Sequence, residues 1–174
     1  IDSKFKKGFL NYGEVFFPGK KKKEILFSTY VCHPSMANNE VSGPSLSVFI
    51  SRHVKQLKSR NYSYRIVFVP ETIGAIVWLN RNEQNVVKIK HGLVATCVGD
   101  AGISTYKKSR QGDAEIDQIV IDVLKKSGDD YKITSFDPLG SDERQFCSPG
   151  FNLPVGSLRR SSPPNFPEYH TSAD

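Results

Sequence analysis

Long apolar runs are missing from this chain, and their absence excludes several classes of protein. No run approaches the ~20 residues that a membrane-spanning helix needs, and the first residues do not show the pattern of a secretory signal. Internal repeats and low-complexity linkers are missing too. With 38% hydrophobic and 24% charged residues over 174 positions, the composition excludes a disordered or collagen-like chain and suffices for a buried core.

Cysteine and methionine are scarce. The three cysteines, Cys32, Cys97 and Cys147, form no CxxC pair, and each lies in or beside an apolar run. We therefore expect buried free thiols in a reducing compartment, the cytoplasm, rather than a disulfide or cysteine–zinc framework. The single methionine is Met36, and the chain begins at Ile1 in ordinary sequence. We expect residues 1–174 to be a single domain and a fragment of a longer chain. The sequence makes no prediction of the oligomeric state.

Acidic residues are fewer than basic ones, 18 against 24, which gives a net charge of +6. The densest basic run, residues 20–23, follows Pro18 and Gly19 and lies between two apolar runs. A Pro-Gly turn between strand-like runs predicts a β-hairpin with a solvated tip. Contact with nucleic acid is the alternative, but no aromatic residues interleave with these lysines. We expect neither a nucleic-acid nor a membrane partner.

Apolar runs alternate with helix-like segments along the chain. The segment 114–127 is the clearest helix, because apolar residues recur at helical spacing and Gly128 can end it. The alternation predicts an α/β domain with layers around a mostly parallel sheet. Strands are predicted over 9–17, 24–31, 64–69, 92–98, 131–136 and 153–158, and helices over 43–60, 72–81 and 114–127.

Polar side chains follow four of the predicted strands. His33, Glu71 and Asp100 each come soon after a strand, and His170 comes after the last one. Because sites in open α/β sheets lie beyond the carboxyl ends of the strands, we expect these side chains to meet at one edge. His, Asp and Glu are zinc ligands, and a carboxylate beside the metal can act as a general base.

Each of these residues also has an ordinary structural explanation. His33 could be a histidine satisfied within a turn, and His170 a surface histidine near a chain end. Glu71 could complement the dipole of the following helix, and Asp100 could simply make a turn. Only their joint placement favours a metal site. Nearby, Asp142 and Glu143 stand next to Arg144, either as a structural ion pair or as a substrate clamp.

Five stretches, in the same order, resemble the zinc exopeptidases of the bacterial leucyl aminopeptidase type, and more closely a group of bacterial aminopeptidase-like proteins. The resemblance runs from about residue 9 to the end of the chain. It implies a three-layer αβα sandwich with a mostly parallel central sheet and a metal site at the strand ends. The stretches are CHPS at 32–35 running into NNEVSG at 38–43, VPETIG at 69–74, GDAG at 99–102, SDERQFCSPG at 141–150 and EYHTSAD at 168–174.

The resemblance also implies a ligand set. In these exopeptidases one zinc ion is held by a His, a bridging Asp and a second Asp, which correspond to His33, position 39 and Asp100. The other ion is held by the bridging Asp, a Glu and the last His, which correspond to positions 39 and 72 and to His170. One or two zinc ions are therefore the implied cofactor.

Two positions depart from the family pattern. Asn39 replaces the bridging aspartate, and a neutral amide does not offset the repulsion between two dications; Glu40 could reach in instead. Thr72 replaces the glutamate ligand. These departures argue against a full two-zinc site. A single ion held by His33, Asp100 and His170, completed by Glu40, Glu71 or Glu143, is the alternative.

The resemblance implies a metal-dependent hydrolase that cleaves an amide or peptide bond, with Glu71 as the general base on a water activated by the metal. Glu40 and Glu143 could recognise a free α-ammonium group, which would make the protein an aminopeptidase. The implied substrate is a small peptide or another amide-bearing small molecule. Asp142, Arg144 and Tyr169 complete the expected substrate-binding residues.

A hydrolase that has lost its activity and binds a ligand without cleaving it is the alternative, favoured by Asn39 and Thr72. The basic stretch at 107–110 could then face an acidic ligand, such as a phosphate or a sugar acid, or could be a solvated strand edge. The resembling group is associated with bacterial surface-glycan biosynthesis, which implies a sugar-linked ligand or substrate.

Overall fold

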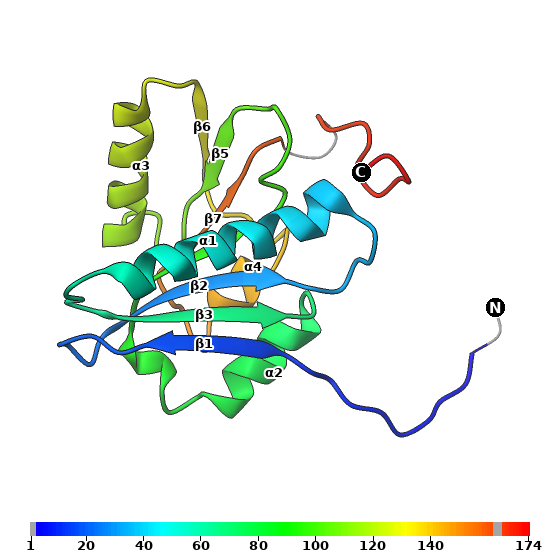
Figure 1. The fold of residues 1–174 in the computed structure, drawn as a ribbon, viewed down its shortest axis with the longest axis horizontal. Coiled ribbons are helices and arrows are strands. Elements are labelled where there is room, and N and C mark those ends of the chain that lie inside the picture. The colour runs from blue at the N-terminus through cyan, green and yellow to red at the C-terminus, as the bar shows by residue number, and fades with distance from the viewer. Residues whose placement is uncertain (1–2, 162–164) are drawn as a thin grey trace.

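A seven-stranded mixed sheet organises the residues that the computed structural model describes, 3–161 and 165–174. Its strand order is β1-β3-β2-β4-β7-β5-β6 (Figure 1). The pairs β3–β2, β2–β4, β4–β7 and β5–β6 are parallel, and the pairs β1–β3 and β5–β7 are antiparallel. The strands span Gly13–Phe17 (β1), Glu24–Tyr30 (β2), Ser63–Val69 (β3), Ile89–Ala95 (β4), Ser104–Lys107 (β5), Tyr131–Thr134 (β6) and Val155–Arg159 (β7).

Helices cover both faces of this sheet. Successive residues of a strand point to opposite faces, and on β2 the side chain of Leu26 enters the core beneath α2, whereas Thr29 lies against Gly43 at the start of α1. The helical segments are a π-helical turn η1 (Ala37–Val41), α1 (Ser42–Gln56), α2 (Ile73–Arg81), a 3₁₀ turn η2 (Val86–Lys88), α3 (Glu115–Ser127) and α4 (Glu143–Phe146).

Strand β5 extends the same division to the other half of the sheet. The hydroxyl of Tyr106 donates to Asp117 of α3 at 2.8 Å, and the next residue, Lys107, pairs with Glu143 of α4 at 2.6 Å. Through the register of β5, β7 and β4, Tyr106 shares the face of α1 and Lys107 the face of α2. Helices α1 and α3 therefore cover one face, in front in Figure 1, and α2 and α4 cover the other.

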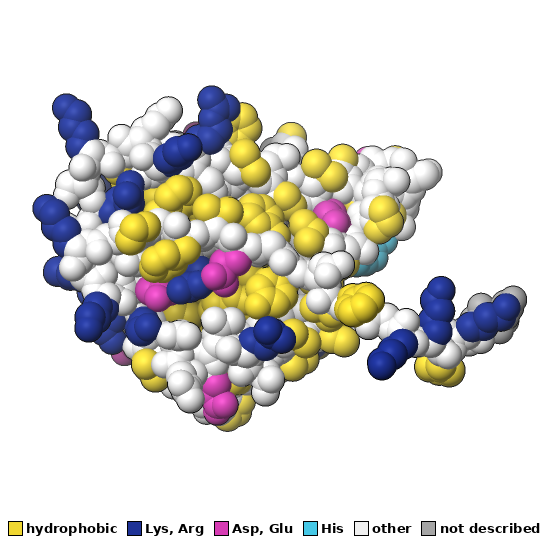
Figure 2. Space-filling model, turned by 60° about the horizontal axis from the view of Figure 1, so that its bottom comes forward, with side chains coloured by type: hydrophobic (Ala, Val, Ile, Leu, Met, Phe, Trp, Pro, Cys, Tyr) yellow, Lys and Arg dark blue, Asp and Glu magenta, His cyan; other side chains and the backbone are white. Residues whose placement is uncertain are grey.

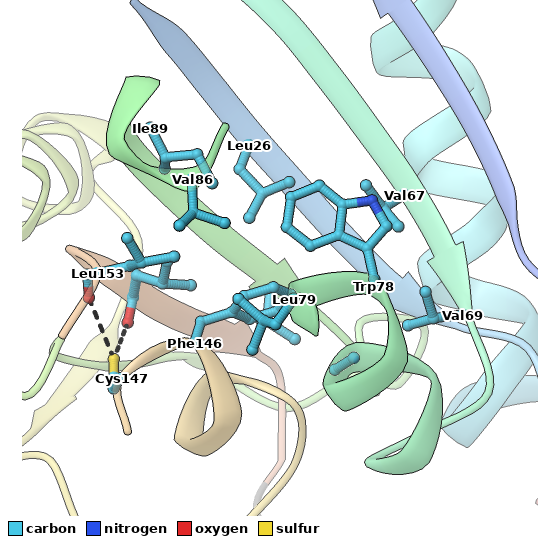
Figure 3. Packing of buried hydrophobic residues seen from close by; sticks show 13 residues of the cluster. Leu26, Val67, Val69, Trp78, Leu79, Val86, Ile89, Phe146, Cys147 and Leu153 are labelled. Carbon is cyan, nitrogen blue, oxygen red and sulfur yellow. Dashed lines mark hydrogen bonds between the residues drawn. The ribbon is translucent and has the colours of Figure 1, made fainter. Parts of the chain in front are cut away.

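The main core lies between the sheet and the helices α2 and α4 (Figure 3). Trp78 of α2 meets Phe146 of α4 edge to face, with ring centroids 6.0 Å apart. The thiol of Cys147 donates to the carbonyls of Leu153 at 3.4 Å and Val155 at 3.1 Å. A helix as short as α4 is not stable alone, so these contacts hold it in place.

The edge strand β1 leaves apolar side chains partly exposed. Val15 is 38% and Phe16 44% exposed, and hydrophobic side chains surround acidic and basic ones on this side of the molecule (Figure 2). Arg65 of β3 pairs with Glu24 at 2.6 Å and with Glu14, and its guanidinium lies 4.6 Å from the centre of the Phe16 ring. Charges on an edge strand oppose pairing with other chains.

The expected α/β sandwich is confirmed, and all six predicted strands and all three predicted helices are present. Their boundaries shift: the first strand begins at Gly13 rather than at residue 9, and the first long helix ends at Gln56 rather than at residue 60. The sequence did not predict β5 or α4. Among the described residues, no helix has the length and apolarity to cross a membrane.

The predicted hairpin around Pro18 and Gly19 is wrong. Strand β1 pairs antiparallel with β3, not with β2. The N–H groups of Lys20 and Lys21 donate to the carbonyls of Arg60 at 2.9 Å and Asn61 at 2.8 Å. The basic run therefore follows the segment that leads into β3, and long-range pairing with that buried strand replaces the local turn.

The prediction of free thiols is confirmed for all three cysteines. Cys97 and Cys147 are buried as expected, whereas Cys32 is exposed. Cys32 lies outside the core because it comes after the last residue of β2, where the chain leaves the sheet.

Replacing the ring that anchors α4 tests this packing. We expect Phe146→Ala to lower the free energy of unfolding by about 3–5 kcal/mol, because the side chain is fully buried against Trp78. Urea denaturation, followed by the fluorescence of Trp78, measures the change. Phe49→Ala, at a position 67% exposed on α1, is the control and should change stability by less than about 0.5 kcal/mol. Equal losses in the two variants would contradict the assigned core.

Candidate active site

Two strand ends and the C-terminal segment meet at one end of the sheet. Strands β2 and β3 end on the same side, where Figure 1 shows the C-terminal segment beyond the start of α1. Cys32 and His33 follow β2, and Glu71 follows β3. One ligand atom from each of these three residues lies within 4.8 Å of the others. Among residues 3–161 and 165–174, this is the group of His, Cys, Asp and Glu side chains compact enough to hold a metal ion.

His33 stands at the centre of this group. Its Nδ1 lies 3.2 Å from the sulfur of Cys32 and 3.5 Å from Oε2 of Glu40, and its Nε2 lies 3.8 Å from Oε2 of Glu71. The backbone N–H of His33 also donates to the Glu40 carboxylate. The imidazole is partly buried, with 28% of its side chain exposed. Glu40 therefore orients the histidine from behind, and Glu71 faces its other nitrogen.

Glu71 lies on a strained turn between β3 and α2. Its backbone N–H donates to the Cys32 sulfur at 3.2 Å. The next residue, Thr72, has φ of 61° and ψ of −69°, a conformation that costs free energy for a β-branched residue. The N–H of Thr72 donates to Oδ1 of Asp142 at 2.6 Å. Asp142 thus holds the turn that carries Glu71.

Asp142 is itself fully buried at the start of α4. Burial raises the pKa of its carboxyl to about 7, the Thr72 N–H opposes that rise, and the charges of Glu71 and Glu143 add to it. Its second oxygen, Oδ2, is buried without a hydrogen-bond partner among the described residues. A carboxyl in this environment suits a positioning role rather than direct contact with solvent.

Glu143 and Lys107 form an ion pair inside the protein. Their side chains are both 1% exposed, with Oε1 and Nζ 2.6 Å apart. Lys107 also donates to the carbonyl of Leu139 at 2.5 Å. The structure therefore places Glu143 in the interior rather than on the surface of the site. Lys107, which the sequence placed at a solvated strand edge or against a ligand, is buried because its ammonium group is satisfied by Glu143 and the loop before α4.

Asp100 is brought to the same end of the sheet but is engaged through both oxygens. Its Oδ1 accepts from the N–H of Gly102 at 2.7 Å and the hydroxyl of Ser161 at 2.6 Å, and its Oδ2 accepts from Nδ2 of Asn38 at 3.1 Å. Burial acts to raise the pKa of this carboxyl, but the hydrogen bonds from these groups outweigh it and hold the pKa below its usual value. Asp100 thus joins three loops and is not in the compact group around His33.

The C-terminal segment brings His170 to His33. Their ring centroids are 5.2 Å apart, and Tyr169 stacks on His170 at 3.9 Å. His170 Nε2 lies 3.3 Å from Nδ2 of Asn39. The other side-chain atom of Asn39, Oδ1, is buried without a hydrogen-bond partner among the described residues, which leaves one oxygen at the site that a cation could use.

Asp174 fixes this arrangement, a role that the sequence analysis did not assign to it. Its Oδ1 accepts from the N–H groups of Asn38 at 2.9 Å and Asn39 at 2.8 Å, and its Oδ2 accepts from the N–H of His170 at 3.2 Å. One carboxylate thereby ties the C-terminal segment to the η1 turn. The sequence analysis also missed Cys32, although its position between a strand and His33 was a signal for it.

The donor set fits a zinc ion. Thiolate, imidazole and carboxylate are the groups that zinc binds in proteins, and Cys32, His33 and Glu71 supply one of each, with His170 beside them. Among the described residues, Cys32, His33 and Glu71 form a single compact group, which fits one ion. Arg144 lies elsewhere, in a cavity of about 480 Å³ whose lining includes neither Glu71 nor His33.

Sequence and structure comparisons agree with this fold. The family model described as "Domain of unknown function (DUF4910)" matches residues 3–174. A Clostridium acetobutylicum protein named "Putative polysaccharide biosynthesis protein with aminopeptidase-like domain" is 57% identical over 174 residues, which are 100% of this chain and 40% of that protein. A crystal structure of a "putative peptidase" from the same organism is 56% identical, with a TM-score of 0.90 over 93% of this chain and 38% of that one.

More distant structures share the fold. The aminopeptidase from Aneurinibacillus sp. strain AM-1 has a TM-score of 0.77 at 16% identity, over 94% of this chain and 42% of that one. A Zn-dependent exopeptidase from Parabacteroides distasonis has a TM-score of 0.71 at 18% identity, over 92% of this chain and 68% of that one. At such identities the likeness shows the fold alone. The chain spans about 40% of the length of its curated relative.

The clamp made by Asp174 can be tested without any substrate. We expect Asp174→Ala to speed hydrogen–deuterium exchange at the amides of Asn38 and Asn39, and to cost about 1–3 kcal/mol of stability, because two buried N–H groups lose their acceptor. Exchange followed by mass spectrometry measures the first effect. Asp129→Ala, at an exposed position, is the matched control. Unchanged exchange at Asn38 and Asn39 would mean that Asp174 does not hold the η1 turn.

Proposed function

The chain belongs to the family described as "Domain of unknown function (DUF4910)", and we propose that it acts as a metal-dependent hydrolase that cleaves a peptide or other amide bond, in the manner of an aminopeptidase. Its aminopeptidase-like fold supports a peptidase-like hydrolase. One observation carries the finer proposal: the Glu71 carboxylate lies 3.8 Å from Nε2 of His33 at the strand ends where this fold carries its chemistry.

We propose that zinc is the metal and that one ion binds. We assign Cys32 and His33, two members of the compact group, and the neighbouring His170 as ligands, and keep Glu71, the third member, as the base. Oδ1 of Asn39 is a neutral oxygen beside them. Glu40 acts through His33, which it orients as the outer carboxylates of zinc sites orient their histidines. Asp100 could bind the ion only by giving up hydrogen bonds to Gly102, Ser161 or Asn38.

Bound zinc would polarise the scissile carbonyl and lower the pKa of an attacking water. Glu71 would accept the proton of that water and return it to the leaving amine. The position of Glu71 depends on two hydrogen bonds. The backbone N–H of Glu71 donates to the Cys32 sulfur, and the N–H of Thr72 donates to Asp142. These contacts keep the carboxylate facing His33, so the base needs little rearrangement as the reaction proceeds.

We propose a small peptide or an amide-bearing small molecule as the substrate. Glu143 is paired with Lys107 in the interior and the Glu40 carboxylate is engaged with His33, so we assign neither of these two acidic groups to a free α-ammonium group. The name of the Clostridium relative supports a substrate connected with polysaccharide biosynthesis. The three free cysteines suit the reducing cytoplasm, where we propose that the protein acts.

Metal content tests the first half of this proposal. Protein stripped with EDTA and then given zinc should retain about one equivalent after dialysis, measured by elemental analysis. His33→Ala should lose nearly all of it and Cys32→Ser part of it, because each removes a ligand. His53→Ala removes an exposed histidine on α1 and should bind as the unaltered protein does. Zinc retention that is the same in His33→Ala and His53→Ala would contradict the site.

Turnover tests the role of Glu71. We expect Glu71→Gln to lower kcat on L-aminoacyl p-nitroanilides by about 10²–10⁴-fold, with zinc content unchanged, because the amide keeps the shape but cannot take a proton. Glu83→Gln, at an exposed position, should leave kcat unchanged. If Glu71→Gln loses zinc together with activity, Glu71 is a ligand and the proposed base is wrong.

A further inference from the structure

A separate cavity opens beside Glu71. Its volume of about 290 Å³ lies just below the range of roughly 300–1,000 Å³ that is common for ligand sites. Tyr30 at the end of β2 and Thr96 after β4 line it, and so do Ser141, Arg159 at the end of β7 and Tyr169. The cavity therefore joins the candidate base to three strand ends and to the C-terminal segment.

Arg159 is the cation in this cavity. Its Nε is buried and has no hydrogen-bond partner among residues 3–161 and 165–174. Within the same residues its guanidinium forms no ion pair; Glu71 also lines the cavity, but the two groups are not paired. A buried polar donor without a partner is costly, and native proteins rarely retain one without a use.

The neighbouring side chains leave Arg159 without an ion pair. Cys97 and Tyr30 also line the cavity, and the Tyr30 hydroxyl lies 3.9 Å from the Cys97 sulfur rather than on the guanidinium. Glu71 is the carboxylate in the lining, and among the described residues it pairs with His33. The guanidinium is therefore available to a ligand.

Ser141 adds a second, independent donor. Its hydroxyl is buried without a hydrogen-bond partner among the described residues, and it lines the same cavity. A guanidinium and a hydroxyl that both lack partners match a group with several acceptor oxygens and a negative charge. The aromatic side chains of Tyr30 and Tyr169 add flat walls to the cavity.

We propose that this cavity is the specificity pocket of the hydrolase and that it receives a carboxylate group of the substrate, which accepts hydrogen bonds from Arg159 and Ser141. This inference rests on the proposed function for its substrate but not for its binding chemistry. The carboxylate could belong to an acidic amino acid or to a sugar acid. Both present the same two oxygens, and the choice between them is a matter for experiment.

Binding is measured first, because it needs no turnover. Thermal unfolding of the unaltered protein and of Glu71→Gln is followed with two matched pairs of compounds. The pairs are L-glutamate with L-glutamine, and D-glucuronate with D-glucose. Each compound is added at up to about 20 mM, the range for a weak ligand. We expect the charged member of one pair to raise Tm more than its neutral partner in both proteins. The pair that responds identifies the source of the carboxylate.

Two variants assign that preference to the pocket. Arg159→Gln should abolish it, and Ser141→Ala should reduce it. Arg160→Gln is the matched control, because the neighbouring side chain is exposed and donates to the Gly102 carbonyl instead. A preference that survives in Arg159→Gln, or its absence from both pairs in the unaltered protein, would overturn the proposal. If Arg159→Gln does not fold, the response of Ser141→Ala decides.

Turnover separates this pocket from the proposed reaction. On L-glutamyl and L-glutaminyl p-nitroanilides, we expect kcat/KM to favour the glutamyl substrate by about 10- to 100-fold, and Arg159→Gln to remove that preference. Hydrolysis of both substrates at equal rates would overturn the pocket but not the hydrolase. Charge-selective binding without any hydrolysis would support the pocket and refute the hydrolase.

Discussion

The candidate site depends on one hydrogen bond, from the backbone N–H of Thr72 to the carboxylate of Asp142. It holds Thr72 at a positive φ that few β-branched residues adopt, and so directs Glu71 toward His33. Asp142 is held in turn by α4, which is anchored by the buried pair between Lys107 and Glu143. The position of the partly exposed Glu71 carboxylate is thereby set by interactions inside the protein. The four-residue helix α4 connects the two.

Much of the fold was predictable because burial leaves a pattern in sequence. Apolar runs identified most strands, and helical spacing with Gly128 at φ 79° identified α3. The polar β5 has no such pattern, since its Lys107 is buried by pairing with α4 rather than by being apolar. The hairpin failed because a Pro-Gly turn is a local signal, whereas β1 pairs with a strand some 50 residues away.

The site was predictable to a similar extent. The rule that strand ends meet predicted that His33, Glu71 and His170 lie close together, as they do in the structure, whereas their roles stay predictions. It could not show that the Asp100 carboxylate accepts a hydrogen bond from Ser161, because that partner is 61 positions along the chain. Nor could it single out Arg159, because no motif marks a buried Nε that has no hydrogen-bond partner among the described residues. Hydrogen-bond partners at long range are set by packing, which a single sequence does not reveal.

The clamp by Asp174 has a consequence for how the site can open. His170, Tyr169 and Asp174 lie within residues 168–174, and Asp174 connects them to a turn at residues 37–41. These connections are side-chain hydrogen bonds rather than strand pairing, so they can break locally without unfolding the sheet. Release of this one carboxylate would withdraw His170 from His33 while the seven strands stay paired.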